Sequence, residues 1–193
     1  MIGELALLDW RRRIFDLYAD VRASEPEDGW LRWCSVRAEL FRTHPQSPQP
    51  GYDALDYFPY DPSLRLHAEV EPAEAERIEL AGSAGSSFAF RRFGRVRGDF
   101  GALAVYWLEG YGGGLFLPFR DATAGSETYG AGRYLLDTVK GADLGSADGR
   151  LVLDFNFAYN PSCAYADEWA CPLAPPENRL EVAILGGEKS LLP

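Results

Sequence analysis

The sequence contains few of the residues that most often mark a chemistry, with three cysteines and two histidines in 193 residues. An odd cysteine count in a chain of this length is not the pattern of a small disulfide-stapled domain, so reduced thiols are expected. These five residues lack the tight C-x-x-C or H-x-x-x-H spacing of metal sites. We therefore predict no metal site, and zinc held by Cys163 and Cys171 with His44 and His67 is the weaker alternative.

Long hydrophobic runs and nucleotide-binding motifs are also absent. No segment has the roughly twenty apolar residues of a membrane span, and the first arginines follow the apolar stretch, which is the reverse of a secretory signal. The Gly-Ala-Gly at residues 130–132 does not fit a dinucleotide fingerprint, and no Walker-type loop occurs. The sequence thus favours a cytoplasmic protein without a membrane partner and gives no support for ATP or NAD.

Positive charge is scarce as well. There are 29 acidic against 19 basic side chains, for a formal net charge of -10. Such a protein repels nucleic-acid phosphates unless its basic residues gather on one face. The arginine-rich runs at residues 11–13 and 91–97 are interleaved with apolar residues, which is typical of solvated faces. No nucleic-acid partner is expected.

The N-terminal third is predicted to be helical and then extended. Apolar residues at three- and four-residue steps predict amphipathic helices over residues 4–23 and about 28–42. Residues 44–63 contain five prolines, each of which restricts its own backbone and the residue before it. The aromatic residues among these prolines indicate a connector that is pinned across the surface of the core.

From residue 64 onward the pattern alternates, as half-buried strands do. Eight short runs separated by Gly or Asp turns predict a mainly β (α+β) fold, an antiparallel barrel or split-barrel-like sheet with two N-terminal helices. We expect one domain over residues 1–193, with a helical prefix at 1–43, the proline-rich connector at 44–63 and the β body at 64–193. The eight predicted strands lie at residues 64–72, 76–85, 87–98, 102–110, 115–121, 133–139, 150–157 and 179–187.

The segment FRDATAGSETYGAGRY, residues 119–134, is the first candidate site. Its glycines permit close approach of a ligand to the backbone, and Arg120 and Arg133 offer forked donors for a carboxylate or a phosphate. Asp121 and Tyr129 complete its polar set. The alternative is a glycine-bearing hairpin in which Arg120 and Asp121 form an internal ion pair.

A second polar segment covers residues 154–178. Strand alternation puts Asp154 and Asn156 on one face, where they could line the mouth of a pocket or cap the next turn through Asx hydrogen bonds. Cys163 could act as a nucleophile only if a histidine from the remote half of the chain supplied the base. The alternative for this residue is a buried, inert thiol.

Several runs of the chain resemble the domain of unknown function 1684 family. They are YFPYDP, LFLPFRDATAGSETYGAGRYL and FNFAYNPSCAYADEWACPLAPPENRLEVAILGGEK, together with LLDWRRR and ELFRTHPQSP near the start. The resemblance extends over nearly the whole chain, and the YNPSCAY, CPL and PPENRL pieces are specific. It implies one cytoplasmic domain and carries no activity with it. Ala131 stands where the pattern would have another glycine.

We expect the two polar segments to meet at one pocket that binds a small anionic ligand, because arginines converge there in an otherwise acidic protein. Catalysis and any cofactor stay open, and a flavin in a split barrel is one specific version. The rival hypothesis is a non-catalytic interaction module that docks a partner or a second copy as a homodimer. The predicted ligand-binding residues are Arg120, Asp121, Tyr129, Arg133, Asp154, Asn156, Tyr159, Asn160, Cys163, Glu177 and Asn178.

Overall fold

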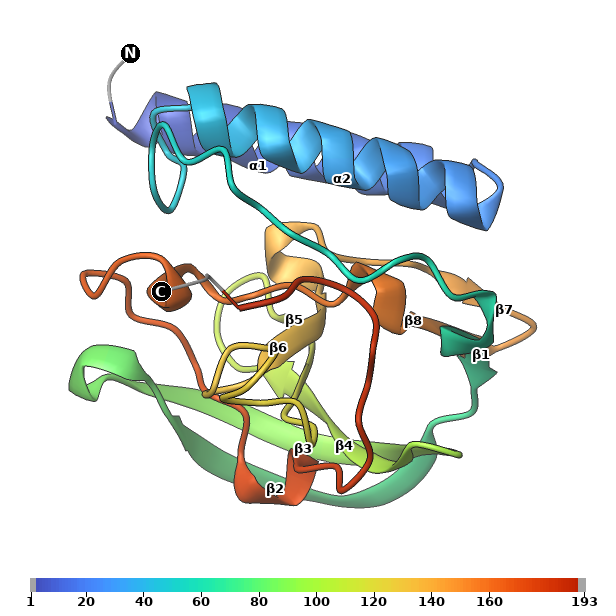
Figure 1. Ribbon diagram of the computed structural model, residues 1–193. Coiled ribbons are helices and arrows are strands. Elements are labelled where there is room, and N and C mark those ends of the chain that lie inside the picture. Colours follow the sequence, from blue (N-terminus) through green and yellow to red (C-terminus); the bar gives the residue numbers. More distant parts are fainter. Residues whose placement is uncertain (1–2, 191–193) are drawn as a thin grey trace.

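The computed structural model describes residues 3–190. Two helices, α1 (Gly3–Arg22) and α2 (Pro26–Thr43), form a hairpin that lies on the opposite side of the molecule from the long strands of the β body (Figure 1). Both helices were predicted from the sequence, and their bounds agree within two residues. No helix within residues 3–190 has the length and apolar content that crossing a bilayer requires.

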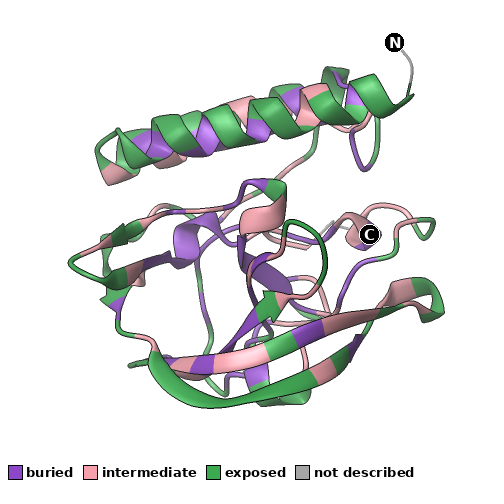
Figure 2. Cartoon of the chain, turned by 180° about the vertical axis from the view of Figure 1, so that it is seen from behind, coloured by how far each residue is buried: buried purple, intermediate pink, exposed green. Residues whose placement is uncertain are grey.

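Each helix begins where its residues favour a helix. Pro26 stands in the first turn of α2, where its missing N–H costs nothing, and Glu27 and Asp28 follow it at the positive end of the helix dipole. One face of α1 is buried through Ile14, Leu17 and related residues, while the opposite face is exposed (Figure 2). The hairpin is therefore held by packing against the β body.

The β body consists of two separate antiparallel sheets. The larger sheet has the order β2-β3-β4-β5-β6, and the smaller one has the order β1-β8-β7. No closed barrel exists within the described residues, so the barrel part of the prediction is unconfirmed while the mainly β architecture is confirmed. The strands are β1 (Arg65–Ala68), β2 (Glu71–Ala81), β3 (Ser87–Gly98), β4 (Gly101–Leu108), β5 (Gly114–Phe119), β6 (Arg133–Asp137), β7 (Ser146–Ala147) and β8 (Arg150–Asp154).

Three predicted strands differ from the structure. The run 64–72 divides, because β1 pairs with β8 whereas β2 pairs with β3 in the other sheet. The run 150–157 ends at Asp154, whose carboxylate accepts a hydrogen bond from the Asn156 backbone and starts a 3₁₀ turn, Phe155–Phe157. The run 179–187 is not a strand. It makes only isolated backbone contacts, with residues 120 and 122 near its start, and its later backbone groups bind the side chains of Arg133 and Asp121.

The core lies where the helical hairpin meets both sheets. Trp33 from α2 packs edge-on against Phe157 with ring centroids 5.4 Å apart, and Phe155 packs in the same way against Phe119 at 5.2 Å. A smaller cluster surrounds Phe90 within the five-stranded sheet. Aromatic pairs of this geometry stabilise beyond the area that they bury.

The proline-rich connector is fixed to the body, as the sequence predicted. The backbone N–H of Phe58 donates to the carbonyl of Gly187 at 3.0 Å, and the N–H of Lys189 donates to the carbonyl of Asp56 at 2.9 Å. Phe58 itself is buried. The connector and the last described residues thus lie side by side across the molecule.

Gly132, just before β6, has a positive φ of 98°, and a Cβ at this position would lie 2.5 Å from the carbonyl oxygen of Phe119. We predict that Gly132→Ala lowers the free energy of unfolding by about 2–4 kcal/mol, since backbone strain of about 1–3 kcal/mol adds to a steric clash. Gly125→Ala is the control, because Gly125 has a φ of 86° and open space around it. Denaturant unfolding of both variants measures the difference, and equal losses would contradict the prediction.

Candidate functional site

The two polar segments that the sequence singled out do lie together. The backbone N–H of Tyr134, in β6, donates to the carbonyl of Tyr159 at 2.9 Å, and the N–H of Tyr159 donates back at 3.0 Å. Their rings are 5.7 Å apart. Residues from the middle and the last quarter of the chain therefore share one region, and the question is which of their side chains face open space.

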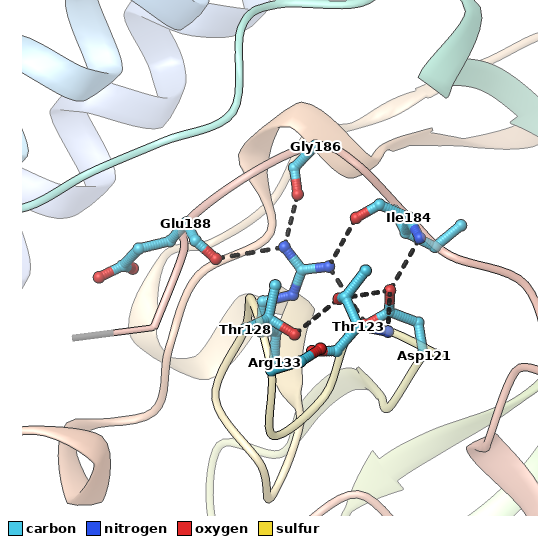
Figure 3. A network of polar contacts seen from close by, with 8 residues as sticks. Asp121, Thr123, Thr128, Arg133, Ile184, Gly186 and Glu188 are labelled. Carbon is cyan, nitrogen blue, oxygen red and sulfur yellow. Dashed lines mark hydrogen bonds and ion pairs between the residues drawn. The ribbon is translucent and has the colours of Figure 1, made fainter. Parts of the chain in front are cut away.

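Arg133 points into the protein and not into a pocket (Figure 3). Its guanidinium donates to the backbone carbonyls of Gly186, Ile184 and Glu188, the last two at 3.1 and 3.2 Å, and contacts the Asp121 carboxylate at 3.4 Å. Burial lowers the pKa of Arg133, and the Asp121 carboxylate acts against that shift. The geometry of this guanidinium is that of a structural tie.

Asp121 completes this tie on its other oxygen. That oxygen accepts from the backbone N–H of Ile184 and from the Thr123 hydroxyl, both at 2.8 Å, and Thr123 in turn contacts the Thr128 hydroxyl (Figure 3). Arg120 is exposed and pairs only through its backbone. The expected internal pair between Arg120 and Asp121 is therefore replaced by a pair between Arg133 and Asp121.

Other predicted residues bind the protein's own backbone. The Asn178 amide donates to the carbonyls of Ala104 and Pro118 and accepts from the N–H of Ala104, all within 3.0 Å. Asn156 bridges Asp154 and the backbone of Asp61. Such closed sets of hydrogen bonds fix loops in place. For Asp154 and Asn156 the structure agrees with the alternative in which they cap the next turn through Asx hydrogen bonds.

Glu177 and Tyr129 lie nearer the surface. The Glu177 carboxylate pairs with Arg92 at 2.7 Å and accepts from the Tyr106 hydroxyl at 2.7 Å. The Tyr129 hydroxyl is 3.8 Å from the sulfur of Cys163. These two residues are far less enclosed by partners than Arg133 or Asn178.

A second buried charge cluster was missed in the sequence. Arg37, in α2, donates through Nη2 to the Glu188 carboxylate at 2.8 Å and through Nε to the Tyr57 hydroxyl at 3.3 Å. Glu188 is 1% exposed and also accepts from the backbone N–H of Asn160 at 3.0 Å and from the Tyr165 hydroxyl. The sequence contains an indication of this cluster, because Arg37 lies four residues from both Trp33 and Phe41 and thus falls within the apolar stripe of the helix.

Arg37 also lines a cleft between the helical hairpin and the β body. The cleft leaves about 70 Å³ available to the centres of water molecules. The guanidinium carbon of Arg37 lies 4.9 Å from the Trp33 ring and 5.2 Å from the Tyr159 ring. The full lining is Trp10, Ile14, Tyr18, Trp33, Arg37, Phe41, Pro48, Tyr134, Lys140, Ala142, Tyr159, Asn160, Pro161 and Ser162.

The charged residues that line the cleft are cationic. Arg37 and Lys140 contribute positive charge, and no acidic side chain of the described residues belongs to the lining. Their carboxylate partners lie just outside the lining, Glu188 at 2.8 Å from Arg37 and Asp137 at 3.7 Å from Lys140.

Asn160 adds a polar side chain to the lining. Its amide nitrogen donates to the carbonyl of Lys189 at 2.8 Å, and its Oδ1 is buried without a hydrogen-bond partner among residues 3–190. An unpaired buried acceptor is costly, so this atom is the clearest unmet requirement in the cleft.

The metal alternative has no geometric basis within the described residues. No group of three His, Cys, Asp or Glu side chains in residues 3–190 is placed to hold an ion. Both ring nitrogens of His44 are occupied, one by the Asp9 carboxylate at 3.2 Å and the other by the backbone N–H of Gln46 at 3.1 Å. His44 is therefore committed to the helical hairpin.

Fold and cleft together define a class: a two-sheet β protein with a helical hairpin across an aromatic, positively charged cleft. The model of the family described as "Protein of unknown function (DUF1684)" matches residues 50–189. The chain belongs to this family, as its sequence resemblance indicated. The helical hairpin lies outside the matched residues, although α2 supplies Arg37 and Trp33 to the cleft.

A solved structure supports the same assignment. The chain is similar to an uncharacterized protein of Haloarcula marismortui whose solution structure was determined by NMR, with 33% identity, a TM-score of 0.56, and coverage of 85% of this chain and 95% of that one. No curated protein matches the chain. The comparisons thus show the family and the fold, and the geometry of the cleft carries the functional argument.

Replacing Arg133 tests its structural role. We predict that Arg133→Met lowers the free energy of unfolding by about 3–5 kcal/mol, because Asp121 and three carbonyls lose their buried partner. Arg120→Met, at an exposed neighbouring arginine, should change stability by less than about 0.5 kcal/mol. Urea unfolding of both variants checks this. A neutral effect at Arg133 would mean that the buried network does not hold the fold together.

Glu188 gives a pH-dependent prediction. Burial raises the pKa of this carboxyl in the folded protein, while Arg37 and the Asn160 N–H act in the opposite direction. The folded state thus holds the Glu188 proton more tightly than the unfolded state does. The stability that this contributes is complete below the unfolded pKa and is lost as the pH rises through the folded one. Wild type should therefore gain stability relative to Glu188→Gln as the pH falls below neutral.

Unfolding free energies of wild type and Glu188→Gln across this pH range give the comparison, and the other raised carboxyls, Asp137 and Asp154, cancel in it. If the stability of wild type relative to Glu188→Gln instead falls on acidification, the ion pair with Arg37 affects the Glu188 pKa more strongly than burial does.

Proposed function

We propose that the protein binds a small organic anion with an apolar or aromatic body in the cleft between the helical hairpin and the β body. The observation that carries this proposal is a buried guanidinium in an aromatic lining that holds a second cation and no acidic side chain of the described residues. Ligand sites are mostly apolar with a few fixed polar groups, and this cleft has that composition.

Arg37 is suited to recognise the anionic group. Its Nε and Nη2 are held by Tyr57 and Glu188, and the hydrogen bonds found for the guanidinium leave Nη1 free for a ligand. Three aromatic rings lie within 5.2 Å of its carbon, which fixes the plane of the fork before any ligand arrives. A preorganised guanidinium loses little freedom on binding a carboxylate or a phosphate.

Lys140 and Asn160 add selectivity. The Lys140 side chain is 56% exposed, so it supplies positive charge from the solvent side of the cleft, where it lies 3.7 Å from the Asp137 carboxylate. The unpaired Oδ1 of Asn160 requires a donor. We therefore propose an organic acid that also carries a hydroxyl or amine, and Tyr159 and Asn160 are the predicted ligand-binding residues that this proposal keeps.

Two other versions are weaker. A flavin was suggested through a closed or split barrel, and the two separate sheets give no such enclosure within residues 3–190. An interaction module accounts for the closed hydrogen-bond set around Asn178 but not for the aromatic cleft with its two cations. Binding is the function that the cleft supports best, and the proposal includes no catalytic step.

Ser162, at the lining of the cleft, provides a matched test. We predict that 4-hydroxybenzoate raises the melting temperature of wild type, whereas 4-hydroxybenzyl alcohol, which lacks the charge, does not. Ser162→Glu should weaken 4-hydroxybenzoate binding at least about tenfold relative to Ser162→Gln, because the two side chains have the same size and differ in charge. Calorimetric titration measures both affinities.

Equal affinities for the two Ser162 variants, or a response to the alcohol as strong as to the acid, would contradict anion recognition. Flavin mononucleotide belongs in the same screen as an arm of its own. A melting-temperature rise with the flavin alone would favour that version over an aryl acid.

A further inference from the structure

Cys163 and Cys171 lie against each other in the loop that follows Asn160. Cys163 is in the 3₁₀ turn Ser162–Ala164, and its backbone N–H donates to the sulfur of Cys171 at 3.4 Å. The two residues are 8% and 2% exposed. The sequence shows them only as seven residues apart, and the fold brings the second thiol back onto the first.

Two hydroxyl groups from other parts of the chain lie at this pair. The Tyr129 hydroxyl lies 3.8 Å from the sulfur of Cys163. The Ser83 hydroxyl accepts from the backbone N–H of Cys171 at 2.9 Å and donates to the carbonyl of Trp169 at 2.6 Å. Cys163 therefore has a polar group at its sulfur, and the backbone of Cys171 is held in place beside it.

From this arrangement we propose that Cys163 and Cys171 form a dithiol site that a hydroperoxide oxidises reversibly to an intramolecular disulfide. Cys163 is the attacking residue, since it is the more exposed of the two and precedes Ala164, which lines an open surface hollow with Tyr129 and Gly130. Cys171 is the resolving residue, because it is already in contact with Cys163.

Ionisation favours the same roles. A hydrogen bond with Cys171, and a further one with Tyr129, lower the pKa of Cys163 to about 6 against the effect of burial, while the pKa of Cys171 is raised. Burial and then the charge of Cys163 raise the pKa of Tyr129, and the nearby Asp167 carboxylate adds to this effect, so the hydroxyl stays protonated as a donor. A thiolate at neutral pH is the reactive form of cysteine.

The reaction balances in two steps. The Cys163 thiolate attacks one peroxide oxygen, the O–O bond breaks, and a sulfenic acid forms while the other oxygen leaves as hydroxide and takes up a proton. The Cys171 thiol then attacks the sulfenic sulfur, the S–S bond forms, the S–O bond breaks, and water leaves. Two thiols lose two electrons in total, and the hydroperoxide is reduced by the same number.

Cys34 is an internal reference for this proposal. Burial is the main cause that raises its pKa to about 12, so it stays a thiol at neutral pH. It lies in α2, and no other cysteine of the described residues pairs with it. Peroxide should therefore leave Cys34 unmodified while the other two cysteines react.

The experiment treats the whole protein with hydrogen peroxide, denatures it, labels the remaining thiols with a maleimide and maps the peptides by mass. We expect a disulfide between Cys163 and Cys171, one remaining thiol at Cys34, and recovery of all three thiols with dithiothreitol. Cys171→Ser should stop at a sulfenic acid that dimedone traps on Cys163. Cys34→Ser, the matched control, should still form the disulfide.

Iodoacetamide labelling gives a second readout that does not depend on disulfide formation. The labelling rate of Cys163 in wild type should exceed that of Cys34 at neutral pH, and Cys171→Ala and Tyr129→Phe should each slow it. The proposal is overturned if peroxide modifies Cys34 first, if both loop thiols survive, or if Cys163 proceeds to a sulfinic acid in wild type without a disulfide. None of these readouts depends on the ligand cleft.

Discussion

The fold depends on the hydrogen bonds that one short stretch of chain, residues 184–190, provides to two buried guanidinium groups. Arg37 meets the Glu188 carboxylate, and Arg133 meets the carbonyls of Ile184, Gly186 and Glu188. An ion taken out of water costs several kcal/mol unless its hydrogen bonds are replaced. The stretch gives three of its carbonyls to Arg133, and its backbone pairing with the chain is limited to isolated contacts such as the bridge between Tyr57 and Glu188.

The same requirement shapes the cleft. Glu188 binds α2 through Arg37, and it binds the loop after Tyr159 through the Asn160 N–H and the Tyr165 hydroxyl. The helix and this loop both line the cleft. A site held in this way has its cation fixed by packing and by its ion pair before a ligand enters. The Asn160 side chain donates through its nitrogen to the carbonyl of Lys189, and its oxygen has no hydrogen-bond partner among residues 3–190.

Patterns in the sequence predicted what depends on local periodicity. The two helices, the pinned connector and most strands of the larger sheet follow from apolar spacing and from proline. The barrel prediction was not confirmed, because the chain passes from the smaller sheet to the larger one between β1 and β2. The spacing of apolar residues in the sequence does not indicate this change of sheet. Arg133 was correctly noticed but assigned to a ligand, since a guanidinium that binds carbonyls looks the same in sequence as one that binds an anion. Arg37 and Glu188 were missed because their partners lie 151 positions apart.

The position of residues 184–190 along the chain has a consequence for biosynthesis. This stretch is synthesised after both helices and the eight strands of the described residues. While those elements emerge, Arg37 lacks the Glu188 carboxylate, and Arg133 has Asp121 but not its three carbonyls. Burial of Arg37 without its partner is costly, so we expect the helical hairpin to dock on the β body only after residue 188 has been added.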